Sequence, residues 1–361
     1  MIQDDLKTKM VLLSGPRQVG KTTLAKQIPL SEYLNWDISK HRERILKEEW
    51  PIDKKIWILD EIHKFRNWRN LLKGLYDEFH GKSEIIVTGS ARLDAYRRGG
   101  DSLQGRYFFH RLHPFTWKEL KLNLASEISL LWEFGGFPEP LFKQSKSFHK
   151  RWLRDYRTRL IQEDLASLEN LQDLGNLELL QLLLPERIGS PLSYASLSRD
   201  LQISPKTALN WVNVLERLYS IFLVPSYQKN TIRSVKKEKK HYHWDWSLVE
   251  NPGAKLENLV ASHLLKWVHF KQDTEGEDLN LYYFRDTDGR EVDFVVANLK
   301  KPILAIEVKL SDDEIHKPLK YFLNKFPETE CWQVHLNGKK DYQSQEGIRV
   351  APVSKLLEKL V

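Results

Sequence analysis

The sequence predicts an α/β protein with an N-terminal parallel sheet, a helical middle and a C-terminal α/β domain. Its 361 residues are enough for two or three domains with separate hydrophobic cores. Three short runs near the N-terminus are nearly apolar on both faces, as the strands of a parallel sheet are when helices cover both its sides. These runs are residues 10–13, 56–59 and 85–88.

The apolar spacing becomes helical after residue 119 and returns to strand-like runs near the C-terminus. Helices are predicted at 22–27, 152–165 and 257–270, and strands at 281–284, 292–296 and 303–308. We therefore expect domains at residues 1–118, 119–245 and 246–361.

The composition restricts where the protein works. The single cysteine, Cys331, excludes an internal disulfide and a cysteine-based zinc cluster, which favours a reducing compartment. No apolar run approaches the ~18 residues needed to span a bilayer, and the N-terminus carries acids where a signal peptide would be basic. We therefore expect a cytoplasmic protein without a membrane partner.

Residues 15–22 read Gly-Pro-Arg-Gln-Val-Gly-Lys-Thr and match the phosphate-loop pattern G-x-x-x-x-G-K-[ST]. The loop lies between a predicted strand and a predicted helix, which is the setting that this motif requires. Gly15 and Gly20 let the backbone form a nest of N–H groups that binds phosphates. Lys21 is expected to reach the β- and γ-phosphates, and the hydroxyl group of Thr22 to bind Mg²⁺.

Two acids, Asp60 and Glu61, follow the second apolar run. They supply the acidic site that ATP hydrolysis needs in addition to a phosphate loop. We expect Asp60 to hold Mg²⁺, directly or through water, and Glu61 to activate the attacking water as a base. The next strand ends near Thr88 and Ser90, either of which could sense the γ-phosphate; the sequence does not decide between them. ATP and Mg²⁺ are the predicted cofactors. The predicted contacts with them are Gly15, Pro16, Arg17, Gln18, Val19, Gly20, Lys21, Thr22, Thr23 and Asp60.

Together these motifs resemble a large prokaryotic family that joins an AAA-type P-loop ATPase module to a C-terminal domain of unassigned function. That second domain resembles PD-(D/E)xK restriction-endonuclease-like folds. The resemblance rests on the motifs at 15–24, 59–61, 88–90, 105–106, 112–115 and 135–139. It implies ATP hydrolysis, and it implies a homo-oligomer because AAA-type modules usually act as rings.

The resemblance also implies an arginine that stabilises charge on the γ-phosphate, either in its own subunit or in a neighbouring one. Arg106 follows the sensor strand at the matching position. Arg92, Arg97 and Arg98 lie nearby in the sequence, so the choice among the four stays open.

Residues 192–218 predict a helix-turn-helix within the helical region. Ser204 is a suitable N-cap, and Pro205 suits the first helical position because it has no N–H to lose. The stripe expected to be buried consists of Leu209, Val212, Leu215 and Leu218. The residues expected to point outward are Lys206, Thr207, Asn210 and Asn213. The arrangement is similar to a winged helix-turn-helix, spanning about 185–245, whose second helix can enter the major groove of DNA.

A basic segment follows where the wing of such a domain would lie. Its basic residues are Lys229, Arg233, Lys236, Lys237, Lys239 and Lys240. With Glu238 as the one acid, residues 229–240 contribute +5 of the formal net charge of +7. The segment predicts contact with DNA phosphates. The alternative is a solvated loop in a domain that bridges other domains or binds protein.

Asp293, Glu307 and Lys309 match the D…E-x-K pattern of endonuclease-like folds. Residues two apart in a strand face the same way, so Glu307 and Lys309 share one side. We expect Asp293 and Glu307 to bind Mg²⁺, and Lys309 to orient or activate the attacking water. The resemblance adds Glu257, on the preceding helix, to the acidic set.

Two functions remain open on the sequence alone. One is an ATPase coupled to DNA binding or processing through the winged-helix-like segment, the basic segment and the C-terminal domain. The other is a nucleotide-switched interaction protein whose C-terminal domain is a catalytically silent scaffold.

Overall fold

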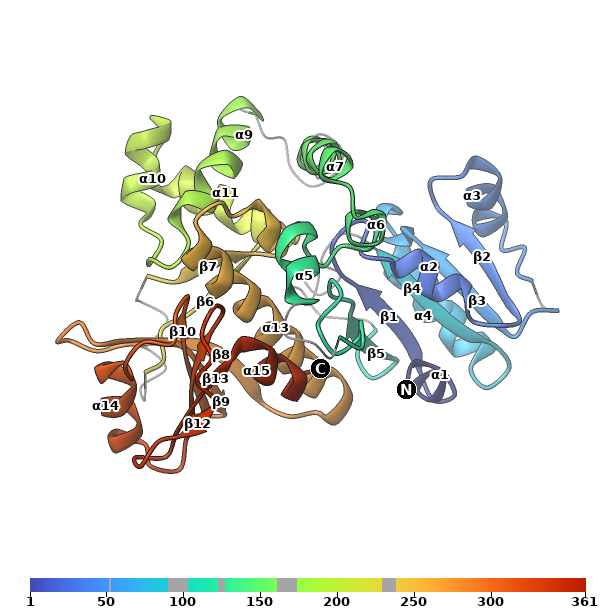
Figure 1. Ribbon diagram of the computed structural model, residues 1–361. Coiled ribbons are helices and arrows are strands. Elements are labelled where there is room, and N and C mark those ends of the chain that lie inside the picture. The colour runs from blue at the N-terminus through green and yellow to red at the C-terminus, as the bar shows by residue number, and fades with distance from the viewer. Residues whose placement is uncertain (52, 90–102, 123–126, 161–173, 229–237) are drawn as a thin grey trace. The chain divides into compact units, whose positions relative to one another are not determined.

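The computed structural model describes residues 1–51, 53–89, 103–122, 127–160, 174–228 and 238–361 (Figure 1). The described chain divides into two compact units. The first contains the described residues between Met1 and His113 together with Arg217–Tyr219, and the second contains the rest. The predictions for Ser90, Arg92, Arg97, Arg98 and the basic residues between 229 and 237 lie outside the described residues.

A five-stranded parallel sheet forms the centre of the first unit, in the order β2-β3-β4-β1-β5. Its strands are β1 (Met10–Ser14), β2 (Ser31–Asn35), β3 (Ile56–Asp60), β4 (Glu84–Gly89) and β5 (Tyr107–Arg111). The three central strands contain the three apolar runs of the sequence, which confirms that prediction. The edge strands β2 and β5 were not predicted, and most of their residues are only half-buried.

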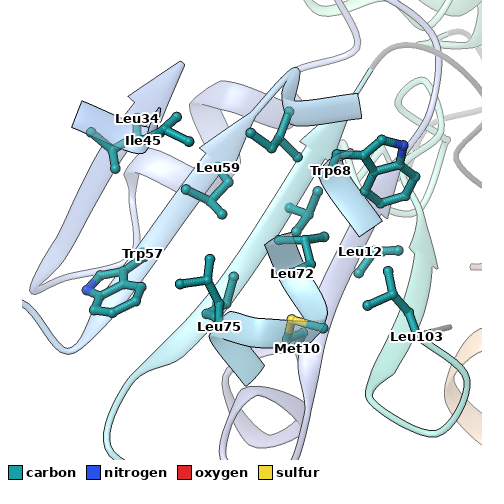
Figure 2. Packing of buried hydrophobic residues seen from close by; sticks show 13 residues of the cluster. Met10, Leu12, Leu34, Ile45, Trp57, Leu59, Trp68, Leu72, Leu75 and Leu103 are labelled. Carbon is teal, nitrogen blue, oxygen red and sulfur yellow. The ribbon is translucent and has the colours of Figure 1, made fainter. Parts of the chain in front are cut away.

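Helices cover both faces of this sheet, which explains why its central strands are apolar throughout. They are α1 (Ile2–Leu6), α2 (Lys21–Lys26), α3 (Ser39–Leu46) and α4 (Trp68–Phe79), with a short 3-10 helix η1 (Ile62–Lys64). Met10 and Leu12 of β1 pack in a cluster that includes side chains of α3 and α4 (Figure 2). Val11, which lies between them, packs in a separate cluster with Leu6 of α1 and Ala25 of α2. Neighbouring residues of one strand therefore enter different cores.

The second unit begins with helices, as the sequence predicts for the middle of the chain. They are α5 (Ile128–Phe134), α6 (Pro138–Lys143), α7 (Lys146–Arg159), α9 (Leu174–Leu183), η5 (Leu184–Arg187), α10 (Tyr194–Leu201) and α11 (Pro205–Arg217). The hydroxyl group of Ser204 accepts a hydrogen bond from the backbone N–H of Thr207 (3.0 Å), as expected for the cap of α11. The antiparallel strands β6 (Ile221–Val224) and β7 (Lys240–His243) follow.

One member of the predicted buried stripe of α11 is wrong. Leu209 is 38% exposed, whereas Val212, Leu215 and Leu218 are buried. Ala208 takes the buried position one turn before Val212, because residues four apart lie on the same face of a helix. Of the residues expected to point outward, Lys206 and Asn210 are exposed, and Thr207 and Asn213 are half-buried.

A six-stranded mixed sheet forms the C-terminal part of the second unit, in the order β12-β13-β11-β10-β9-β8. Its elements are η6 (Trp246–Leu248), α13 (Pro252–Glu275), β8 (Leu279–Arg285), β9 (Glu291–Asn298), β10 (Lys301–Lys309), α14 (Lys317–Lys325), β11 (Glu330–His335), β12 (Tyr342–Gln343), β13 (Ile348–Pro352) and α15 (Val353–Lys359). β8, β9 and β10 are antiparallel neighbours, whereas β10, β11 and β13 are parallel. The three predicted strands are confirmed as β8, β9 and β10.

The long helix α13 begins earlier than the predicted residue 257. Asn251 caps it by accepting a hydrogen bond from the backbone N–H of Ala254 (3.0 Å), and Pro252 occupies the first turn. Gly276, with a φ angle of 70°, ends it. Within the described residues, no helix combines the length and the apolar character that crossing a bilayer requires.

Candidate functional site

The phosphate loop follows β1 and turns sharply before α2. Gly15 has a φ angle of +151°, and a Cβ atom there would lie 2.3 Å from the carbonyl oxygen of Leu112, so a side chain does not fit. Gln18 (φ 58°) and Gly20 (φ 103°) are left-handed. Left-handed residues of this kind are typical of a nest of backbone N–H groups that binds anions.

Lys21 and Thr22 begin α2 directly after the loop. Lys21 is 7% exposed, and its Nζ atom donates hydrogen bonds to the carbonyl oxygens of Gly15 (2.9 Å) and Pro16 (2.7 Å). The ammonium group is therefore held against the loop. The hydroxyl group of Thr22 donates to Oδ2 of Asp60 (3.0 Å), which joins the loop to β3.

Asp60 is the centre of a hydrogen-bonded cluster at the carboxyl end of the sheet, and it is 5% exposed. Its Oδ2 atom accepts hydrogen bonds from Thr22, from the hydroxyl group of Tyr33 (2.5 Å) and from Nδ2 of Asn35 (3.2 Å). Its Oδ1 atom accepts a hydrogen bond from Thr88 (2.5 Å). Among the described residues, all of these donors are neutral, so they orient the carboxylate without compensating its charge.

Tyr33 and Asn35 are members of this cluster that sequence reasoning misses. They lie on the edge strand β2, where Asn35 pairs in register with Asp60. Because β2 lacks an apolar pattern, the sequence gives only a weak indication of these two residues. It is that a polar residue, Asn35, directly follows the buried Leu34. Burial, together with the hydrogen bond to Asp60, raises the pKa of Tyr33, which keeps its hydroxyl group protonated as a donor.

Glu61 follows Asp60 in an uncommon left-handed conformation, with a φ angle of 57°. Its backbone N–H donates to the carbonyl oxygen of Thr88 (2.9 Å), which fixes the turn against β4. Its Oε2 atom lies 3.4 Å from Nζ of Lys64 and 3.7 Å from Nε2 of His63. Burial lowers the pKa of His63, which favours the neutral ring. A mostly buried carboxylate is therefore fixed beside Asp60.

Of the two predicted sensor residues, Thr88 lies within the described part of the chain and Ser90 does not. Thr88 is fully buried, and its register partner on β3 is Asp60. Its hydroxyl group donates to the Asp60 carboxylate, so in this structure Thr88 positions the acid.

Arg106 lies at the opposite end of the sheet from the phosphate loop. Tyr107, the next residue, pairs with Met10 at the start of β1, whereas the loop follows Ser14 at its end. The rise along such a strand is about 13 Å. The guanidinium group pairs with Asp77 of α4, with Nε 2.9 Å from Oδ1. In this structure Arg106 is therefore placed away from the phosphate loop of its own subunit, and its action on a nucleotide, in its own subunit or in a neighbouring one, stays a prediction.

The acids predicted for the C-terminal domain come together, but around a lysine. Lys240 is completely buried, and its Nζ atom lies 3.2 Å from Oε1 of Glu257 and 3.9 Å from Oδ1 of Asp293. Nearby, Nζ of Lys309 donates to Oε1 of Glu307 (2.7 Å), as expected for two residues on one side of a strand. Burial, reinforced by the Glu307 carboxylate, raises the pKa of Asp293 well above its usual value.

The prediction that Lys240 contacts DNA is wrong. Lys240 begins β7, where it pairs with Val224, and its side chain points into the acidic cluster rather than to solvent. Sequence reasoning also misses Glu291, whose Oε1 atom lies 2.7 Å from Nζ of Lys240, and His316, whose Nδ1 atom lies 2.8 Å from Oε1 of Glu307. The spacing of two between Glu291 and Asp293 was the signal for the first of these.

The residues predicted to bind Mg²⁺ in the C-terminal domain do not fit a metal ion as they are arranged. Their carboxylate oxygens are suitable ligands. However, the Lys240 ammonium group already contacts two of the three predicted acids. Within the described residues, no group of three or more His, Cys, Asp or Glu side chains is placed to hold a metal ion.

Comparisons with known proteins match three successive segments of the chain. Residues 7–121 match a family described as an AAA domain. Residues 125–253 and 252–356 match two families described as domains of unknown function, DUF8612 and DUF4143. The chain therefore has an N-terminal AAA domain, followed by two domains whose descriptions assign no activity.

Curated relatives cover much of the chain at low identity. The uncharacterized protein Rv2008c of Mycobacterium tuberculosis is 22% identical over 333 residues, which cover 83% of this chain and 72% of the relative. The uncharacterized protein Mb2031c of Mycobacterium bovis gives the same values. The uncharacterized protein MJ1637 of Methanocaldococcus jannaschii is 26% identical over 281 residues, which cover 63% of this chain and 58% of the relative.

Proposed function

We propose that the protein is a Mg²⁺-dependent ATPase that binds and hydrolyses ATP at the carboxyl end of the sheet in its AAA domain. The observation that carries the proposal is the convergence of Lys21, Thr22 and Asp60, which come from two elements and meet beside a loop that a glycine makes possible. This is the residue set that P-loop nucleotide hydrolases use.

The residues present at this edge suit Mg²⁺ bound together with ATP. The hydroxyl group of Thr22 and the carboxylate of Asp60 are oxygen ligands 3.0 Å apart, and oxygen is what Mg²⁺ prefers. The neutral donors around Asp60 leave its negative charge for a cation. When bound, Mg²⁺ would neutralise charge on the phosphates.

The chain's own residues have separate tasks in this proposal. The loop amides and the Lys21 ammonium group bind the phosphates and stabilise the charge that develops on them. Glu61 accepts a proton from the attacking water, because its carboxylate is fixed next to Asp60 and is shielded from solvent. Tyr33, Asn35 and Thr88 hold the Asp60 carboxylate in place.

Replacing Asp60 with asparagine is expected to remove the part of ATP binding that depends on Mg²⁺. The amide group lacks the charge, and its NH₂ would face other donors. Binding of a fluorescent ATP analogue should become at least about tenfold weaker in Mg²⁺ and change little in EDTA. Asp53→Asn, at an exposed position of the same unit, is the matched control. A variant whose affinity still rises with Mg²⁺ as in the wild type would exclude Asp60 as the magnesium-holding acid.

The proposal extends to DNA through the middle of the chain. α10 and α11 form a helix-turn-helix, and the antiparallel strands β6 and β7 follow it, as in a winged helix. Lys206 and Asn210 are exposed on α11, the helix that would enter a groove. Exposed basic and amide side chains on such a helix suit contacts with phosphates and bases.

Charge reversal at Lys206 and Lys239 is expected to weaken DNA binding and to flatten its dependence on salt. For every phosphate that the variant no longer neutralises, the slope of log K against log salt should become shallower by about 0.9. Fluorescence anisotropy with duplex DNA from 50 to 200 mM salt, a range of about 0.6 log unit, measures both effects. The double variant Lys143→Glu, Lys150→Glu, at exposed positions of α6 and α7, is the control with an equal change of charge. Equal slopes in the wild type, the Lys206 and Lys239 variant and the control would remove α11 and the residue before β7 from the DNA surface.

A further inference from the structure

Four acids and two lysines gather beside the C-terminal sheet, which itself carries three of the acids and one of the lysines. In the register of β9 and β10, Ile306 pairs with Phe294, so Glu307 and Asp293 take facing positions on neighbouring strands. Glu291 and Lys309 lie two residues further along on the same face. Glu257 approaches from α13, and its Oε1 atom accepts a hydrogen bond from Tyr242 (2.6 Å).

The backbone fixes the direction from which Lys240 enters this cluster. Lys240 pairs with Val224 on one side of β7 and forms an isolated bridge with Pro191 on the other. The backbone N–H of Leu192 also donates to the carbonyl oxygen of Lys239 (2.8 Å). The backbone at Lys240 is therefore paired with two other segments, which fixes the position from which its side chain enters the cluster.

The ammonium group of Lys240 lies among the carboxylates and compensates their negative charge, as a bound metal cation would. It lies 2.7 Å from Glu291, 3.2 Å from Glu257 and 3.9 Å from Asp293, measured from Nζ to the nearest carboxylate oxygen. It also lies 5.5 Å from the centre of the Tyr283 ring, an additional cation–π contact. A divalent cation bound by the same carboxylate oxygens would lie in contact with the positively charged ammonium group of Lys240.

We propose that Lys240 is the resident cation of this acidic cluster and that it excludes a divalent metal from the position where the sequence predicts one. The C-terminal domain, as it is folded here, is then a charge-compensated core rather than a metal-dependent nuclease. This proposal does not depend on ATP hydrolysis at the AAA domain.

The cluster would become a metal site if Lys240 were neutral. Without its ammonium group, the four acids would keep two cationic partners: Lys309 beside Glu307, and Arg285, whose Nε atom lies 3.8 Å from Oε2 of Glu291. One oxygen of Glu307, Oε2, is buried and has no hydrogen-bond partner within the described part of the chain, so it is available as a ligand. Oxygen ligands with an excess of negative charge bind Mn²⁺ and Mg²⁺.

The test is a Mn²⁺ titration of the full chain, stripped of metal and free of nucleotide, followed by the electron paramagnetic resonance signal of free Mn²⁺. We expect wild type and Asp293→Asn to give the same curve, because no bound ion depends on Asp293. Lys240→Met should gain one Mn²⁺ per chain, bound at least about tenfold more tightly than any ion in the wild type. The double variant Lys240→Met, Asp293→Asn should lose that ion again.

Lys266→Met is the matched control, because Lys266 is also a buried lysine of this unit, 8% exposed, with Glu119 and the carbonyl oxygen of Pro114 as partners. It should gain no Mn²⁺. A wild-type Mn²⁺ ion that disappears in Asp293→Asn would overturn the proposal. So would a folded Lys240→Met, checked by circular dichroism, that gains no ion. Should Lys240→Met not fold, the comparison of wild type with Asp293→Asn still decides.

Discussion

Replacing Lys21 with alanine is expected to lower ATP hydrolysis by at least about 100-fold and to weaken ATP binding. In the structure, the Lys21 ammonium group is bonded to the carbonyl oxygens of Gly15 and Pro16, so it already lies over the loop that would hold the phosphates. Alanine removes this charge from a mostly buried position, where a charge acts strongly on the phosphates. Phosphate release under saturating ATP and titration with a fluorescent ATP analogue measure the two effects.

Lys40→Ala is the control for Lys21→Ala, since Lys40 is an exposed lysine of α3 in the same unit. It should hydrolyse ATP at the wild-type rate. Melting curves of both variants without nucleotide distinguish a defect in nucleotide binding from a defect in folding. Turnover by Lys21→Ala at the wild-type rate would remove the phosphate-loop assignment and, with it, the proposed function.

Replacing Glu61 with glutamine should separate ATP binding from ATP hydrolysis, two quantities that Lys21→Ala is expected to lower together. The amide keeps the size of the side chain but cannot accept a proton, so hydrolysis is expected to fall by at least about 100-fold. ATP binding should remain within about threefold of the wild type, because Glu61 is not among the residues placed to hold phosphates or Mg²⁺. Single-turnover hydrolysis and binding of the same ATP analogue separate the two quantities.

Glu78→Gln tests whether any loss in Glu61→Gln is specific, because Glu78 is an exposed glutamate of α4. It should leave both binding and hydrolysis unchanged. A Glu61→Gln protein that hydrolyses ATP normally would show that another group accepts the proton. If its ATP binding fell as much as its turnover, Glu61 would instead be a ligand-holding residue.

The central strands of the first unit could be predicted because burial on both faces leaves a direct mark on the sequence. Ile56 to Leu59 had to be apolar throughout, since alternate residues enter different cores. The edge strands carry no such mark. β2 is half-buried, so its alternation does not distinguish it from a loop, and Tyr33 and Asn35 could not be placed beside Asp60.

The clustering of basic residues in the sequence predicted the position of Lys240 less reliably than the apolar runs predicted the strands. Lys240 belongs to a run of basic residues in the sequence, and a run of this kind usually faces solvent. The structure instead buries it among acids that are 17 to 53 positions further along the chain, such as Glu257 and Asp293. Pairing over that distance depends on the register of β7, which the local sequence does not encode. The phosphate loop was predictable because all its parts are contiguous.

The position of Arg106 restricts the symmetry of any assembly in which it serves a nucleotide. The arginine and the phosphate loop occupy opposite ends of one strand, so the two surfaces that meet would be different on the two copies. A two-fold dimer would have to make this contact twice, once in each direction, whereas a contact that is made once per pair of copies is head-to-tail. Repetition of the contact either closes into a cyclic ring or continues as a filament, and each copy then completes its neighbour.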